Sequence, residues 1–205
     1  MNSNYKEYVG GQRNVNTFMY LKKASHILLN QAKTNEEGSF YNYMTSMLTS
    51  AFYLEAYLNH SGFKFYSVKN ITENESYWKD FERLNPEEKL KKWSEIICLK
   101  IDYGRRPFQI FKEIFKFRNK LVHGKTEIIN VNQIQKVSEE YTYTQLPKLD
   151  WEKMVNMQTA ERFLNDAIKM VEILNKEAGF SSTELYTLAS TSTSTVSQLR
   201  SSEQI

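Results

Sequence analysis

The chain has 205 residues, enough for one domain with a sizeable core, and 40% of them are hydrophobic. With only 7 Gly and 3 Pro, the composition disfavours a many-stranded β-sandwich and favours long helices joined by few loops. The single cysteine, Cys98, excludes an intramolecular disulfide and suits a reducing compartment. No signal peptide is visible, and no apolar run approaches the roughly 18 residues that span a membrane, so we expect a cytoplasmic protein that does not associate with membranes.

The first predicted elements are a flexible N-terminal segment and two helices. The N-terminal segment covers residues 1–13, and apolar residues at helical spacing predict a helix over about 14–33. Ser39 can cap a second, strongly periodic helix over 40–60, and Gly62 is expected to stop it.

The middle of the chain predicts two further helices. Asn85 followed by Pro and two acids is a typical helix start, and this helix is expected to run to about Lys100 with Cys98 buried. The next helix is predicted from Pro107 to His123, with Gly124 as its left-handed cap. Two later segments have a strand-like pattern, Thr126–Val131 and Tyr141–Leu146.

The last long helix is predicted to begin at Asp150, and the character of the chain changes at Ser181. Of the 25 residues from Ser181 onward, 13 are Ser or Thr, which is typical of a disordered tail. The predicted organisation is a flexible N-terminus over 1–13, a helical domain over 14–180 and a tail over 181–205. The fold class is all-α, an up-and-down bundle of four to five main helices.

Positive charge is concentrated in residues 105–125, which hold seven basic residues and one acid, a net charge of +6 in a chain whose total is +3. Such a stretch suits a polyanionic partner, although a solvated basic face has the same composition. The basic residues are Arg105, Arg106, Lys112, Lys116, Arg118, Lys120 and Lys125.

Two residues of opposite charge lie on predicted apolar helix faces. Arg118 is four residues after Ile114 and four before Val122, and Glu55 is three residues before Leu58. A charged residue on such a face is costly unless it is paired or functional. We expect a Glu55–Arg118 ion pair, which would also hold the arginine ready for an anion, or a direct role for Glu55 in chemistry.

His123 follows Arg118 by five residues, about 140° around an ideal helix, so the two side chains converge only if the helix ends near His123. Asn119 lies one turn before His123 and is expected to orient its imidazole for proton transfer. The alternative is a histidine that only interacts with the negative end of the helix dipole.

The segment Arg118-Asn119-x-x-x-His123 resembles the R-x(4–6)-H motif of the HEPN family of helical domains, including the polar residue that often follows the arginine. Two other parts of the chain also resemble this family, the helix over Phe108–Phe117 and the segment Ala51–Asn59 with its acid, Glu55, followed by Asn59. The resemblance covers about residues 15–178.

The resemblance implies a bundle that dimerises and brings two motifs together in a basic cleft. Many such domains are ribonucleases that need no metal or other cofactor, in which the histidine is the general base on the ribose 2′-hydroxyl and the arginine stabilises the phosphorane. The expected catalytic residues are Arg118, Asn119 and His123, with Glu55 and Asn59 in support. RNA would bind through Lys112, Lys116, Lys120 and Lys125.

Aromatic residues on more than one side of the basic helix also favour a homodimer, because one core would not bury them all. They are Phe108, Phe111, Phe115 and Phe117. The expected partners are therefore RNA and a second copy, with an antitoxin or regulatory protein as a further candidate. No metal site is expected, since His26 and His60 lack companions at metal-ligand spacing.

One departure from the family pattern bears on regulation. Toxin members of the family that pair with a nucleotidyltransferase antitoxin often carry a tyrosine two residues after the histidine, whereas this chain has Lys125. Other members have lost catalysis, so the alternative function is a non-catalytic scaffold that binds a nucleotide, RNA or a protein.

Overall fold

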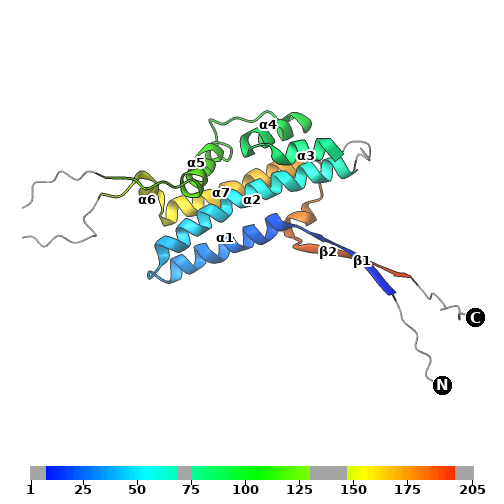
Figure 1. Cartoon of the computed structure of the whole chain (residues 1–205), viewed down its shortest axis with the longest axis horizontal. Helices are drawn as coiled ribbons and strands as arrows, with labels where there is room; N and C mark the ends of the chain where they lie inside the picture. The colour runs from blue at the N-terminus through cyan, green and yellow to red at the C-terminus, as the bar shows by residue number, and fades with distance from the viewer. Residues whose placement is uncertain (1–7, 69–74, 130–146, 197–205) are drawn as a thin grey trace, which may run out of the picture.

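The computed structural model of the chain describes residues 8–68, 75–129 and 147–196, which form a mostly helical protein, as predicted (Figure 1). The described α-helices are α1 (Thr17–Thr34), α2 (Ser39–Val68), α3 (Glu75–Arg83), α4 (Pro86–Ile96), α5 (Ile110–Val122), α6 (Asp150–Met154) and α7 (Met157–Glu177). A strand, β1 (Tyr8–Val15), precedes these helices. A 3₁₀ helix, η2 (Ser182–Tyr186), and a second strand, β2 (Ala189–Val196), follow them. Among the described residues, no helix combines the length and the apolar character needed to cross a membrane.

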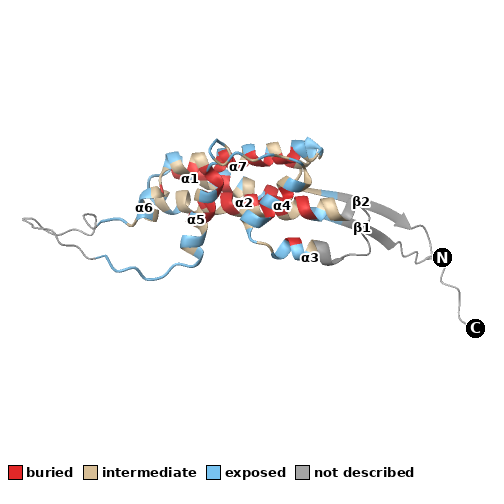
Figure 2. Ribbon diagram, turned by 90° about the horizontal axis from the view of Figure 1, so that it is seen from above, coloured by how far each residue is buried: buried red, intermediate tan, exposed pale blue. Residues whose placement is uncertain are grey.

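The central helix is α2, which packs against α1, α3, α4, α5 and α7. Its neighbours bury several of its sides, so its 30 residues include only two acidic or basic residues, Glu55 and Lys64. The buried hydrophobic side chains form one cluster, and Figure 2 shows in red the helix segments that carry buried residues. The largest fully buried ones include Trp93, Tyr53, Tyr57, Phe111, Phe117 and Phe163.

The predicted start of α4 is confirmed in detail. The Asn85 side chain accepts a hydrogen bond from the Glu88 backbone N–H at 3.0 Å, and the Glu88 carboxylate accepts one from the Asn85 N–H at 3.1 Å. This reciprocal capping box satisfies two donors that would otherwise lack partners at the helix start.

The last predicted helix is interrupted in the structure. A short α6 begins at Asp150, the chain leaves helical geometry at Val155, and α7 begins at Met157. Asn156 caps this second start, because its side chain accepts a hydrogen bond from the Thr159 N–H at 2.9 Å. The prediction of one continuous helix from Asp150 is therefore wrong, and a second capping residue explains the break.

Gly62 does not end its helix, contrary to the prediction, since α2 continues to Val68. A Cβ atom added at Gly62 would lie 2.5 Å from Cε1 of Phe81, a fully buried residue of α3. The glycine therefore serves the close approach of α3 to α2. Its signal in the sequence is the same as that of a helix stop, so only the tertiary contact distinguishes the two roles.

The predicted roles of Gly124 and Cys98 are also wrong. Gly124 does not have a positive φ, whereas Cys98, which follows α4, has a φ of 54° and is exposed. The Leu99 N–H donates to the Ser94 carbonyl oxygen at 2.9 Å, as in a Schellman motif whose left-handed residue is Cys98. A residue usually favoured to be buried is thus exposed because the helix end requires a left-handed residue there.

The ends of the described chain pair with each other, which the sequence did not predict. β1 and β2 form an antiparallel ribbon with Tyr8 opposite Val196 and Val15 opposite Ala189. The expected flexibility of residues 1–13 and disorder from residue 181 are wrong for the residues of these strands and of η2. A segment rich in Ser and Thr is often disordered, but threonine also favours a β-strand once a partner strand is present.

The two strand-like segments have different outcomes. Residues 126–129 are described and contain no strand. The remainder of Thr126–Val131 and all of Tyr141–Leu146 lie outside the described residues.

Candidate functional site

Helix α5 carries most of the predicted site residues. Its apolar stripe packs into the core through Ile110, Phe111, Ile114, Phe115 and Phe117. The opposite side of the helix exposes the predicted RNA-binding and catalytic side chains Lys112, Lys116, Asn119 and Lys120. The helical period of the sequence therefore separates a buried face from a polar one, as predicted.

Arg118 and Glu55 form the predicted ion pair. Nη2 of Arg118 donates to Oε2 of Glu55 at 3.3 Å, and the two side chains are 23% and 24% exposed. The guanidinium also lies 6.0 Å from the centre of the Phe52 ring on α2. The two charges thus link α5 to α2 at the edge of the core.

A third charged residue, Lys89 on α4, belongs to this cluster and was not predicted. Its Nζ lies 4.0 Å from Oε1 of Glu55, and its side chain is only 3% exposed. Burial lowers the pKa of the Lys89 ammonium group, and the charge of Glu55 opposes that shift. The sequence signal that could have indicated the burial of Lys89 is its position four residues before the buried Trp93, which places both residues on one helix face.

The side chain of Asn119 binds Arg118 and not the His123 imidazole, contrary to the prediction. Asn119 meets His123 only through the backbone, where its carbonyl oxygen accepts a hydrogen bond from the His123 N–H at 3.0 Å. Oδ1 of Asn119 accepts a hydrogen bond from Nη1 of Arg118 at 2.8 Å, because a charged donor makes the stronger bond. Nε of Arg118 is buried without a hydrogen-bond partner among the described residues, and the same holds for Oδ1 of Asn59. An unsatisfied buried polar atom costs about 1–3 kcal/mol, so a further donor or acceptor supplied here would be favourable.

His123 is the C-cap residue of α5, and its side chain is exposed. The helix ends at Val122, as predicted, but Arg118 is not among the residues that line the cavity of His123. Five residues correspond to a rise of about 7.5 Å and a rotation of about 140° along an ideal helix, so the two side chains leave the helix in different directions. Among the described residues, no hydrogen bond joins the side chains of Arg118 and His123, and their convergence stays a prediction.

The cavity beside His123 has a volume of about 760 Å³ and lies between the end of α5, the segment that follows it, and α6. We call it the α5–α6 cavity. Its polar lining residues are Glu113, Lys116, Asn119, Lys120, His123, Lys125, Glu127 and Asp150, and its apolar ones are Phe117, Leu149, Trp151 and Met154.

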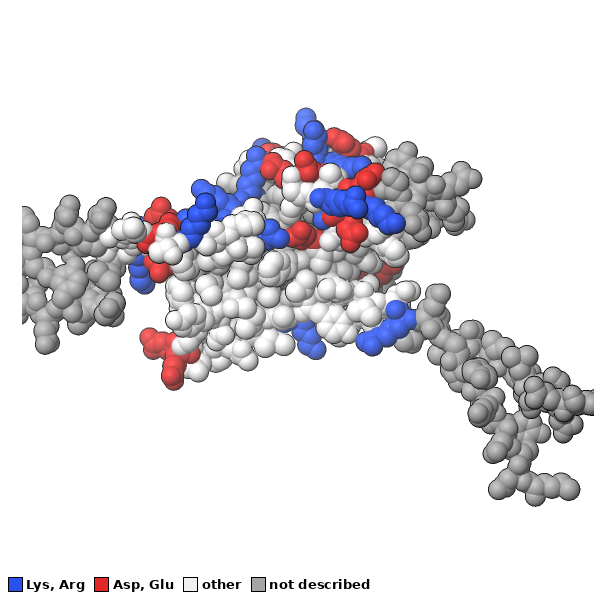
Figure 3. All heavy atoms as spheres, in the orientation of Figure 1, with Lys and Arg blue, Asp and Glu red and all other residues white. Residues whose placement is uncertain are grey.

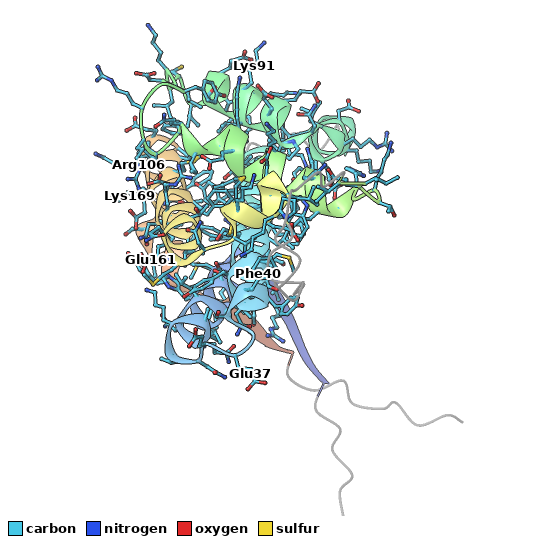
Figure 4. All side chains as sticks on the ribbon, turned by 90° about the vertical axis from the view of Figure 1, so that its left-hand side faces the viewer. Glu37, Phe40, Lys91, Arg106, Glu161 and Lys169 are labelled. Carbon is cyan, nitrogen blue, oxygen red and sulfur yellow. The ribbon has the colours of Figure 1, made fainter. Side chains whose placement is uncertain are left out.

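Most of the basic stretch over 105–125 is neutralised by acids from elsewhere in the fold. Arg106, which lies beside α7 in Figure 4, donates two hydrogen bonds of 2.8 and 2.7 Å to Asp166, a residue only 1% exposed. The other ion pairs are Arg105–Asp102, Lys112–Glu87, Arg118–Glu55 and Lys120–Glu127. Among the described residues, Lys116 and Lys125 alone of this stretch have no acidic partner within 4 Å.

The aromatic residues of α5 and of the turn before it do not project from the molecule. All four that suggested a dimer are at most 8% exposed within a single chain: Phe108, Phe111, Phe115 and Phe117. The α7 helix accounts for one of them, since Phe163 makes an edge-on contact with Phe117. This argument for a dimer is therefore wrong.

The remaining titratable groups of the described residues are dispersed over the fold. Within the described part of the chain, no group of three or more His, Cys, Asp or Glu side chains is placed to hold a metal ion. His60 on α2 lies 3.5 Å from Glu184 of η2 and 4.9 Å from the Phe18 ring, so it connects the C-terminal segment to the bundle.

Comparison of the chain with protein-family models, with curated proteins and with solved structures finds no match.

Proposed function

We propose that this protein is a metal-independent endoribonuclease of the HEPN type, an up-and-down helical bundle that acts as a homodimer in the cytoplasm. The position of Asn119 carries the proposal. Its side chain lines the α5–α6 cavity together with His123 and also accepts a hydrogen bond from Arg118. The cation and the base of the motif are thus linked through one residue.

In the proposed reaction, His123 removes the proton from a ribose 2′-hydroxyl, and the 2′-oxygen attacks the adjacent phosphorus. The bond from phosphorus to the 5′-oxygen breaks, and this oxygen takes up a proton from solvent. The product strand ends in a 2′,3′-cyclic phosphate. Arg118 stabilises the additional negative charge of the phosphorane, a role that suits a permanent cation with several donors.

The charges around His123 support an RNA substrate. Lys116 and Lys125 line the cavity without an acidic partner among the described residues, so each can bind a phosphate. Lys112 and Lys120 have acidic partners, but the two lysine side chains are 65% and 46% exposed, and such pairs contribute little and exchange readily.

The homodimer is supported by a surface of α2 that differs from the aromatic residues first considered. Between Ser39 and Leu54, α2 has no charged residue, yet one side of it reaches solvent. Figure 3 shows a face over α1 and α2 with few charged residues, bordered by basic residues over α5. A second copy on this face would cover Phe52 and bring the two Arg118 guanidinium groups toward each other, since Arg118 lies against Phe52.

The test is cleavage of end-labelled single-stranded RNA by the purified full chain in the presence of EDTA. We expect cleavage by the wild type, none by Arg118→Ala or His123→Ala, and little by Arg118→Lys, because lysine lacks the planar fork of arginine. His26→Ala and Arg105→Ala, at exposed sites away from the cavity, serve as matched controls that retain activity. A requirement for a divalent metal, or activity that survives His123→Ala, would contradict the acid–base assignment.

The dimer has its own test in light scattering at micromolar concentration. A strict monomer that still cleaves RNA would refute the dimeric cleft. Tyr41→Glu, which introduces a charge at a 67% exposed position on the uncharged part of α2, is expected to yield a folded monomer with much reduced cleavage.

The second candidate function is a non-catalytic scaffold that binds a nucleotide, RNA or protein. The observation that favours it is the separation of Arg118, which is held by Glu55, from the cavity of His123. Binding of RNA without cleavage at any protein concentration would favour this second function.

A further inference from the structure

The α5–α6 cavity has two chemically different parts. One part is cationic and polar and comes mainly from α5 and the segment after it, with Lys116, His123 and Lys125. The other is apolar and includes Leu149, Trp151 and Met154, from α6 and the residue before it. A nucleotide has the same two-part character, with an anionic phosphate and a flat, largely apolar base face.

The acids in the lining do not cancel the positive charge of the cavity. Glu113 accepts a hydrogen bond from Arg162, and Asp150 is paired with Lys153, and neither of these two cations belongs to the lining. Glu127 is paired with Lys120 at 2.9 Å. Each acid in the lining is therefore already neutralised, which leaves the charges of Lys116 and Lys125 for a ligand.

Trp151 differs from the other two tryptophans in its environment. Trp93 is fully buried against Phe65 and Phe180, and Trp78 packs against Phe63 and Phe81. Trp151 is only partly buried, and among the described residues it contacts no aromatic ring and no cation over its face. A large aromatic face that lines a cavity without a stacking partner can accept one from a ligand.

We infer that Trp151 is the stacking platform for one unpaired base of single-stranded RNA, with Lys116 and Lys125 bound to the phosphates beside that base. The identity of the ligand as RNA rests on the proposed function. The platform determines which part of an RNA the protein binds. A base must leave its own stack to reach Trp151, and a base paired within a duplex cannot do so. The preferred substrate is therefore unpaired RNA with a base adjacent to the bond that is cut.

The experiment is a fluorescence titration of the full chain with a 2′-O-methyl RNA oligonucleotide, which binds but cannot be cleaved through its 2′-oxygen. We expect the oligonucleotide to quench tryptophan fluorescence in the wild type and in Trp78→Phe, but not in Trp151→Phe. Trp151→Phe keeps a ring and should retain affinity within a few-fold. Trp151→Ala should weaken binding about 5- to 100-fold.

Two ligand controls separate stacking from charge. A duplex of the same sequence should produce no quenching, and an oligonucleotide of abasic sugars should bind equally to wild type and Trp151→Ala. Thermal melting of each variant shows that it is folded. Wild-type affinity in folded Trp151→Ala, or full quenching in Trp151→Phe, would overturn the inference.

The outcomes also separate this inference from the proposed function. If the oligonucleotide binds and quenches as expected while unmodified RNA is not cut, the platform stands and the nuclease proposal fails. If RNA is cut but Trp151→Ala changes neither KM nor binding, the nuclease proposal stands and the platform fails. If the wild type binds no RNA, both are refuted.

Discussion

The carboxylate of Glu55 on α2 lies between two cations, Arg118 of α5 at 3.3 Å and the buried Lys89 of α4 at 4.0 Å. These three residues come from three helices and are far apart in the chain, so the charged cluster forms only when the helices pack. One carboxylate compensates two positive charges at the edge of the core. The balance of this cluster is sensitive to any change in Glu55.

Glu55→Gln is expected to lower the free energy of unfolding by about 1–2 kcal/mol, because it leaves Lys89 and Arg118 without a negative charge between them. Urea denaturation measures the loss. Glu87→Gln is the matched control, since its pair with Lys112 is exposed and should change stability by less than about 0.5 kcal/mol. An unchanged midpoint in Glu55→Gln would mean that the pair contributes nothing.

The Lys89→Met substitution should affect stability differently in the wild type and in the Glu55→Gln variant. In Glu55→Gln it removes a buried cation that has lost its partner, so part of the lost stability should return. In the wild type it removes a partner of Glu55 and brings no such gain. A double-mutant cycle from urea denaturation should therefore show coupling of about 1 kcal/mol, and strict additivity of the two changes would argue against the cluster.

Gly62→Ala is expected to destabilise the protein by about 1–3 kcal/mol, because the new Cβ would meet the buried ring of Phe81 at 2.5 Å. Thermal denaturation measures the effect. Phe81→Leu in the same chain should restore part of the loss by removing the ring atoms that clash. A neutral Gly62→Ala would show that α3 can move away from α2 without cost.

Cys98→Gly should stabilise the protein by about 1 kcal/mol, since glycine adopts the left-handed conformation at this position without steric strain. The equivalent position after α7 is Gly179, with a φ of 67° and the same type of bond from the Phe180 N–H to the Asn175 carbonyl oxygen. Gly179→Ala should therefore cost about 1 kcal/mol. Thermal melts of the two variants should shift in opposite directions, and shifts in the same direction would contradict this account.

Stability is expected to fall as the pH decreases from about 6.5 toward 5. Burial lowers the pKa of His60 below its ordinary value, and the contact with Glu184 only partly opposes this. The unfolded chain then binds the proton more readily than the folded one, so acid favours unfolding across this range.

Two variants test the pH dependence. His60→Gln should flatten the plot of unfolding free energy against pH, and Glu184→Gln should make it steeper, because it removes the group that favours protonated His60 in the folded state. Urea denaturation at several pH values provides the measurement. Parallel plots for the wild type and His60→Gln would exclude His60 as the source. His26, whose pKa is also lowered by burial and then by Lys22 and Lys33, is the next histidine to replace.

The sequence by itself determined the features that depend on neighbours within one helix. The apolar period predicted α1, α2, α4 and α5, and the residues around Asn85 predicted the start of α4, because both follow from contacts three or four residues apart. The Glu55–Arg118 pair could also be predicted from the sequence, since a charge on an apolar helix face requires a partner and the two residues have opposite charges.

The tertiary structure alone decided which charges remain free and which surfaces meet. The +6 stretch loses most of its charge to acids such as Asp166 and Glu55, which are distant in sequence and whose approach no local pattern encodes. Packing likewise decided that Gly62 admits Phe81 and that a Ser/Thr-rich segment pairs with the N-terminal strand. It also paired Arg118 with Glu55 of α2 while His123 lines the α5–α6 cavity, because the partners of a side chain depend on every element packed around it.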